Sequence, residues 1–160
     1  MSVGTGDRVA PFELRCTRGI VTVPDPGGRK TVLMFFQEAG TPVCSAQVRA
    51  LGDEHALLAE LGAAAVCVST DEPEQQDAFS ATLGPGGPVL GSDPGGAIAR
   101  RFGVYDEAAR RANRAAFVID HDGAVLLATP WYNPSNSRQF AAIFAALGLD
   151  DGECTRNDDG

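Results

Sequence analysis

The amino-acid sequence predicts an α/β fold with a mixed central sheet and helices on both faces. Two apolar runs, at 31–36 and 64–69, are uninterrupted, which is typical of strands that are covered on both faces. A helix-like segment lies between them, so a strand–helix–strand unit is expected. Pairs of short strands near each end of the chain predict hairpins, which would add antiparallel strands to the same sheet.

The first half of the chain is expected to hold four strands, at 12–16, 20–23, 31–36 and 64–69. The third strand should lead into a helix from about Pro42 to Leu61, with Pro42 at the first helical position and Thr41 as the N-cap. A second helix is predicted over 72–83, capped by Asp71.

The second half should contain, in order, a short strand at 89–90, a helix at 95–102, strands at 115–119 and 124–128, and a helix at 137–147. His121-Asp122-Gly123 is a turn signal for the hairpin. A length of 160 residues fits one domain, which we place at 1–149. The acidic tail at 150–160 is expected to fray unless another part of the protein holds it.

Charge and composition narrow the function classes. The formal net charge of −8 disfavours nucleic acid and membrane partners, because an acidic surface repels phosphates and anionic lipids. Neither a targeting segment nor a membrane-spanning run is visible, so a cytoplasmic location is expected. The cysteines lack the paired spacing of a zinc site, and no nucleotide motif is present, so we expect no metal and no cofactor.

The chemistry is expected in the segment Thr41-Pro42-Val43-Cys44. Cys44 falls in the first turn of the predicted helix, where free backbone N–H groups and the helix dipole favour a negative charge. Such a position lowers the pKa of a thiol, and the thiolate is the nucleophile that attacks peroxides. The alternative is that Cys44 is a buried, inert cysteine.

This segment resembles the active-site signature of the peroxiredoxin family (alkyl hydroperoxide reductase and thiol-specific antioxidant type), Pro-x-x-x-Thr/Ser-x-x-Cys. Thr41 and Cys44 match it. Weaker landmarks agree in order along the chain: Ala10-Pro11-Phe12, Val68-Ser69-Thr70-Asp71, Arg114-Ala115-Ala116-Phe117 and Gly123. The resemblance covers nearly the whole chain. It implies a thioredoxin-like fold and a thiol-dependent peroxidase that reduces hydrogen peroxide or organic hydroperoxides.

The resemblance also implies roles for three residues. Cys44 would be the peroxidatic cysteine that cycles through sulfenic acid, Thr41 its hydrogen-bond partner, and Arg114 the guanidinium that stabilises the thiolate and orients the peroxide. The alternatives are that Thr41 only caps the helix and that Arg114 is a surface arginine. Gln37 stands where the family has its proline, so we expect a wetter pocket, a different preferred peroxide or weak activity.

The thiol that would reduce the Cys44 sulfenic acid is left open by the sequence. Cys67 lies in an apolar run and is expected to be buried, and Cys16 has no obvious route to Cys44. Cys154 in the tail is a possible resolving cysteine, and a one-cysteine mechanism with an external thiol is the alternative. The reductant would be a thioredoxin-like protein or a low-molecular-weight thiol.

The family further implies a homodimer. Two other functions stay open for the same scaffold: a redox sensor in which Cys44 oxidises without efficient turnover, and a degenerate domain with an inert Cys44.

Overall fold

The structure, a computed structural model, describes residues 3–84 and 88–149. Its centre is a seven-stranded sheet with the strand order β2-β1-β5-β4-β3-β8-β9. The strands are β1 (Phe12–Cys16), β2 (Gly19–Val23), β3 (Lys30–Phe35), β4 (Ala63–Ser69), β5 (Val89–Ser92), β8 (Ala115–Ile119) and β9 (Val125–Thr129). Strands β3, β4 and β5 are parallel, whereas β8 and β1 run antiparallel to their neighbours. The predicted mixed sheet is therefore confirmed.

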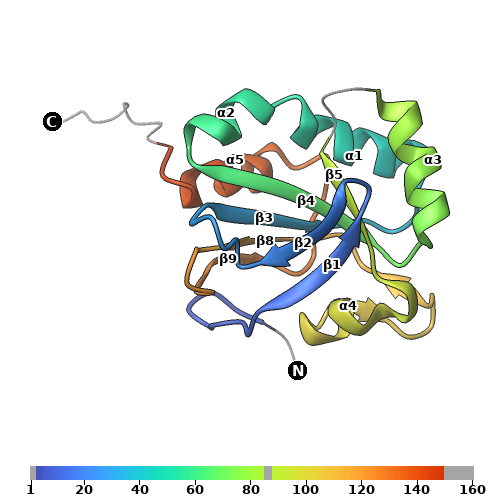
Figure 1. Cartoon of the computed structure of the whole chain (residues 1–160), viewed down its shortest axis with the longest axis horizontal. Coiled ribbons are helices and arrows are strands. Elements are labelled where there is room, and N and C mark those ends of the chain that lie inside the picture. Colours follow the sequence, from blue (N-terminus) through green and yellow to red (C-terminus); the bar gives the residue numbers. More distant parts are fainter. Residues whose placement is uncertain (1–2, 85–87, 150–160) are drawn as a thin grey trace, which may run out of the picture.

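Helices cover both faces of this sheet (Figure 1). One face carries α1 (Pro42–Gly52), α2 (His55–Glu60), α3 (Pro73–Leu83) and α5 (Ser137–Ala146), and the other carries α4 (Ala97–Arg101). Successive side chains of a strand point to opposite faces. Accordingly, Val32 and Met34 of β3 join the core under α1, and Leu33 and Phe35 join the core under α4.

The helix predicted over 42–61 is two helices, so that prediction is wrong in its length. The break falls at Asp53 and Glu54, directly after Gly52, and both Gly52 and Asp53 are residue types with low helix propensity. The Glu54 N–H donates to the Leu51 carbonyl at 3.2 Å, which is the tighter hydrogen-bond spacing that often closes a helix. Helix α2 then starts at His55.

Helix α3 begins at Pro73, one residue later than expected, and its cap is Glu72 and not Asp71. Glu72 and Gln75 form a reciprocal capping box, in which the Glu72 N–H donates to Gln75 Oε1 at 2.8 Å. Asp71 is thereby left to bind elsewhere: its Oδ2 accepts from the Ala39 N–H at 2.8 Å and from the Ser69 hydroxyl at 2.5 Å. These two bonds link the end of β4 to the loop that follows β3.

The second half follows the predicted order with two differences. A short 3₁₀ turn, η1 (Pro94–Gly96), replaces the start of the predicted helix 95–102. A two-stranded sheet of β6 (Tyr105–Asp106) and β7 (Arg111–Ala112) was not predicted, because each strand has only two residues. The β8–β9 hairpin is confirmed, and Gly123 in its turn has a φ of +93°, which glycine adopts without strain.

The tail predicted at 150–160 lies outside the described residues, and so does Cys154. Within 3–84 and 88–149, none of the helices combines the length and the apolar character that a bilayer crossing requires.

Candidate active site

The loop between β3 and α1 is held from several sides. Its first residue, Phe36, donates its N–H to the Val68 carbonyl of β4 at 2.9 Å. Gln47, buried on α1, donates its amide to the Phe35 carbonyl at 3.1 Å. The Ala39 N–H is bound by Asp71, as described above. The backbone path into α1 is therefore fixed at both ends of the loop.

Cys44 is the third residue of α1 and only 1% exposed. Pro42 occupies the first helical position and Thr41 the N-cap, as the sequence predicted. The thiol thus lies in the first helical turn, where backbone N–H groups have no partner within the helix. Gln37 occupies the proline position in this loop, and the wetter pocket expected from it stays a prediction.

The Thr41 hydroxyl makes no helix-capping hydrogen bond, and it donates to the Glu38 carbonyl at 3.1 Å. The same hydroxyl lowers the pKa of the Cys44 thiol. Because a hydroxyl has one proton and rotates freely, it can turn from the carbonyl to the sulfur when the thiol ionises.

Arg114 comes directly before β8 and brings a positive charge to the thiol. Its Nη2 lies 3.9 Å from Cys44 Sγ, and its carbonyl accepts from the Tyr132 N–H at 2.9 Å. Its Nε is buried and has no hydrogen-bond partner in the part of the chain that the structure describes. The structure therefore brings together three residues singled out from the sequence: Cys44, Thr41 and Arg114.

The electrostatics distinguish Cys44 from the other described cysteines. Burial alone would raise the pKa of Cys44, but hydrogen bonds from Thr41 and from the backbone N–H groups of Glu38 and Gln37, with the charge of Arg114, lower it below its ordinary value. Burial raises the pKa of Cys16 to about 11 and that of Cys67 to about 12. Cys44 is thus the one described thiol that is favoured as a thiolate.

Two contributions to this site were not found from the sequence. The first is the pair of backbone N–H groups at Gln37 and Glu38, whose direction depends on the loop conformation and not on residue type. The second is Asp71, which was interpreted as a helix cap. No cluster of three or more His, Cys, Asp or Glu residues that could hold a metal occurs in 3–84 and 88–149.

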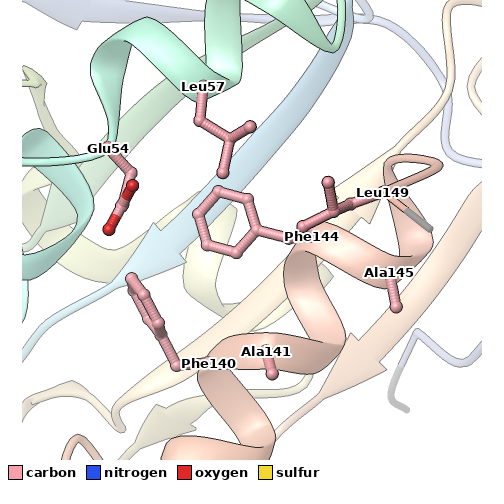
Figure 2. A pocket seen from close by; sticks show the side chains of 7 residues that line it. All are labelled: Glu54, Leu57, Phe140, Ala141, Phe144, Ala145 and Leu149. Atoms are coloured by element: carbon pink, nitrogen blue, oxygen red, sulfur yellow. The ribbon is translucent and has the colours of Figure 1, made fainter. Parts of the chain in front are cut away.

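A separate apolar cavity of about 140 Å³ lies between α2 and α5 (Figure 2). Its walls include Leu57, Phe140 and Phe144, and Glu54 stands at its side. None of the three site residues lines it.

Comparison with known proteins agrees with this geometry. The model of the AhpC/TSA family matches residues 5–128. A Mycobacterium tuberculosis protein named as a peroxiredoxin is 30% identical over 130 residues, which are 77% of this chain and 82% of that protein. Alkyl hydroperoxide reductase C of Bacillus subtilis is 31% identical over 127 residues, which are 75% of this chain and 68% of that protein.

A solved structure shows the same likeness in three dimensions. The crystal structure of peroxidoxin BcpB from Mycobacterium tuberculosis matches with a TM-score of 0.78 and 28% identity, covering 91% of this chain and 96% of that one. These matches confirm the thioredoxin-like fold, with its mixed sheet and its helices on both faces. The chain belongs to the AhpC/TSA family of peroxiredoxins, and it is a thiol-dependent peroxidase.

Proposed function

We propose that Cys44 is the peroxidatic cysteine of this peroxidase. The observation that carries the proposal is the convergence of donors on its sulfur. Thr41, two backbone N–H groups and Arg114 all favour the thiolate and together outweigh the cost of burial. Cys16 and Cys67 have raised pKa values of about 11 and about 12, so both are protonated and poorly nucleophilic at neutral pH.

The reaction we assign to Cys44 is a two-electron reduction of a peroxide. The thiolate attacks one peroxide oxygen, the S–O bond forms, and the O–O bond breaks. The leaving oxygen takes the bonding pair and a proton from solvent and departs as water or an alcohol. The attacked oxygen keeps its own proton, and the sulfur, now oxidised by two electrons, is a sulfenic acid.

Thr41 and Arg114 are assigned to the same step. The Arg114 guanidinium, 3.9 Å from the sulfur, can follow the negative charge as it moves from sulfur to the leaving oxygen. Thr41, freed from Glu38 when its hydroxyl rotates, can donate to the sulfur or to the bound peroxide. Both hydrogen peroxide and organic hydroperoxides fit this chemistry, and we propose both as substrates.

Recycling requires a second thiol. Cys67 is completely buried in β4, and Cys16 is on β1. We therefore retain two routes for reduction of the sulfenic acid, Cys154 or an external thiol from a thioredoxin-like protein or a low-molecular-weight compound. Mass spectrometry of non-reduced, peroxide-treated protein separates them, because the first route gives a Cys44–Cys154 disulfide and the second leaves Cys154 free.

The assembly and location we propose are a homodimer in the cytoplasm, with residues 1–149 as one domain and 150–160 as a tail. Sedimentation velocity of the reduced protein tests the dimer, and cell fractionation tests the location.

Peroxide consumption in the presence of dithiothreitol tests the proposed role of Cys44. The wild type should turn over many equivalents of peroxide, and Cys44→Ser should consume none above background. Cys16→Ser is the control and should match the wild type, because Cys16 has a raised pKa and no assigned role. Oxidation of Cys44 that stops at one equivalent would instead support the redox sensor, and equal turnover by wild type and Cys44→Ser would refute the proposal.

A further inference from the structure

The peptide unit that joins Glu38 to Ala39 is held from both sides, in the loop that leads to Cys44. Its N–H donates to Asp71 Oδ2 at 2.8 Å, and its carbonyl accepts from the Thr41 hydroxyl at 3.1 Å. Because a peptide unit is planar, the carboxylate that binds the N–H also sets the direction of the carbonyl. Asp71 therefore fixes the acceptor that holds the Thr41 hydroxyl at the start of α1.

Behind Asp71, a chain of hydrogen bonds continues into α3 and β5. The Ser69 hydroxyl donates to the same oxygen, Asp71 Oδ2, at 2.5 Å. The side-chain nitrogen of Gln76 lies 2.8 Å from the Ser69 hydroxyl oxygen and 2.7 Å from the Gly91 carbonyl oxygen. Ser69 and Gln76 are each 1% exposed, so water does not compete for these bonds. The active-site loop is thus connected to α3 through buried side chains.

The Gly91 carbonyl fixes the direction in which this chain donates. A carbonyl oxygen accepts and does not donate, so the Gln76 atom beside it must be the amide nitrogen. The same nitrogen donates to Ser69, whose hydroxyl has a single proton. With Gln76 as its donor, that hydroxyl directs its proton to the Asp71 carboxylate. The donors therefore run one way, from α3 towards the active-site loop.

The Gln76 amide is not explained by packing alone. Its Oε1 is buried and has no hydrogen-bond partner within the described ranges 3–84 and 88–149. A buried polar atom without a partner lowers stability, and an apolar side chain of similar length would avoid that cost. What the amide provides is the pair of N–H donors to Ser69 and Gly91.

We propose that Gln76, on α3, is a positioning residue for the Thr41 hydroxyl. It acts through Ser69 and Asp71, which hold the peptide unit at 38–39. This inference rests on the proposed function, in which Thr41 donates to the reacting sulfur or to the bound peroxide. Gln76 would set the place from which that hydroxyl turns, although four hydrogen bonds separate the two side chains.

Gln76→Glu tests this role with almost no change of shape. A carboxylate cannot donate, so the Ser69 hydroxyl would turn its proton to the new acceptor and away from Asp71. Gln75→Glu is the matched control, because it makes the same change at the neighbouring, exposed position on α3. Its carboxylate would still accept from the Glu72 N–H, which Gln75 Oε1 binds at 2.8 Å.

The readout is the second-order rate of Cys44 oxidation by hydrogen peroxide, measured by stopped flow with and without the Thr41 hydroxyl. In the wild-type background, Gln76→Glu should slow oxidation about fivefold, within the range of coupling inside one hydrogen-bond network. In a Thr41→Val background, it should change the rate by less than about twofold, because the hydroxyl that it positions is gone. Gln75→Glu should match its parent in both backgrounds.

Three results would overturn the inference. The first is an unchanged rate in Gln76→Glu, and the second is an equal loss of rate in the Thr41→Val background, which a general loosening of α3 would give. The third is an equal loss in Gln75→Glu, which would assign the effect to the added charge. If Gln76→Glu does not fold, Gln76→Met removes both donors at similar length, and the same outcomes apply.

Failure of this inference is distinguishable from failure of the proposed function. Equal losses with and without the Thr41 hydroxyl would remove the role of Gln76 while Cys44→Ser still abolishes turnover. Turnover retained by Cys44→Ser would instead refute the proposed function, whatever the rate of Gln76→Glu.

Discussion

The Thr41 hydroxyl donates to the Glu38 carbonyl at 3.1 Å, and it lowers the pKa of the Cys44 thiol. Thr41→Val keeps the shape and removes the proton, so the thiolate loses a donor. We expect the rate of oxidation by peroxide at neutral pH to fall about tenfold, the usual effect of a hydrogen bond to a charged group. Thr41→Ser keeps the hydroxyl and should stay within about twofold of wild type in stopped-flow assays. Equal rates for the valine and serine variants would contradict the role of the hydroxyl.

Arg114 acts through charge at 3.9 Å from Cys44 Sγ. Arg114→Gln removes that charge, and we expect kcat/KM for hydrogen peroxide to fall about 10²-fold, as when a donor to a developing oxyanion is removed. Arg111→Gln is the matched control: Arg111 pairs with Glu38 on a largely exposed surface, where an ion pair contributes little. A loss in Arg111→Gln as large as that in Arg114→Gln would argue for a general effect of positive charge and against a specific one.

Among single residues, side-chain chemistry was predictable from the sequence and backbone direction was not. Cys44 and Thr41 were singled out by residue type and by their places at the start of a predicted helix, Arg114 was singled out by the resemblance to peroxiredoxins, and the structure brings the three together. The donors at Gln37 and Glu38 belong to the peptide backbone, so no residue pattern encodes them. Gln37 was interpreted as a polar residue with a free N–H in place of the family's proline, but the direction of that N–H could not be read from the sequence.

At the level of elements, Asp71 connects β4 to the active-site loop through Ala39 and Ser69. Asp71→Ala leaves the Ala39 N–H without its partner and loosens the loop that leads from β3 to Cys44. We expect peroxide oxidation of Cys44 at neutral pH to slow by about tenfold, and the free energy of unfolding to drop by about 1–3 kcal/mol. Stopped-flow kinetics and urea denaturation measure the two effects.

Asp77→Ala is the control for this prediction. It removes the same charge from an exposed position on α3 and should change neither the rate nor the stability appreciably. A normal rate in Asp71→Ala would show that the loop holds its conformation without the carboxylate.

Most elements were predictable because their signals are local, and the errors occurred where two local signals compete. The strands at the centre of the sheet follow from continuous apolar runs. Helix 42–61 was predicted as one piece because its apolar stripe runs across Gly52, and the low helix propensity of Gly52-Asp53 was not weighed against it. Asp71 and Glu72 are both able to cap α3, and the reciprocal partner Gln75 decides for Glu72.

For the whole molecule, the pKa shifts predict how reactivity depends on pH. The pKa of Cys44 is lowered from its ordinary value, so Cys44 becomes a thiolate at a lower pH than an ordinary cysteine does. The rate of oxidation by hydrogen peroxide should therefore rise through that lowered pKa and level off above it, and it should be lost as pH falls through the same pKa. A rate that keeps rising up to about pH 11 would instead assign the reaction to a thiol such as Cys16. Stopped-flow measurements across this range decide between them.

The role of Cys44 is decided by which thiol the peroxide oxidises first. The most direct measurement is a single-turnover reaction of the reduced protein with one equivalent of hydrogen peroxide at neutral pH, with a dimedone trap and mass spectrometry of the peptides. We predict the sulfenic-acid adduct on Cys44, with Cys16 and Cys67 left as thiols. An adduct on Cys16, Cys67 or Cys154 while Cys44 stays reduced would contradict the account.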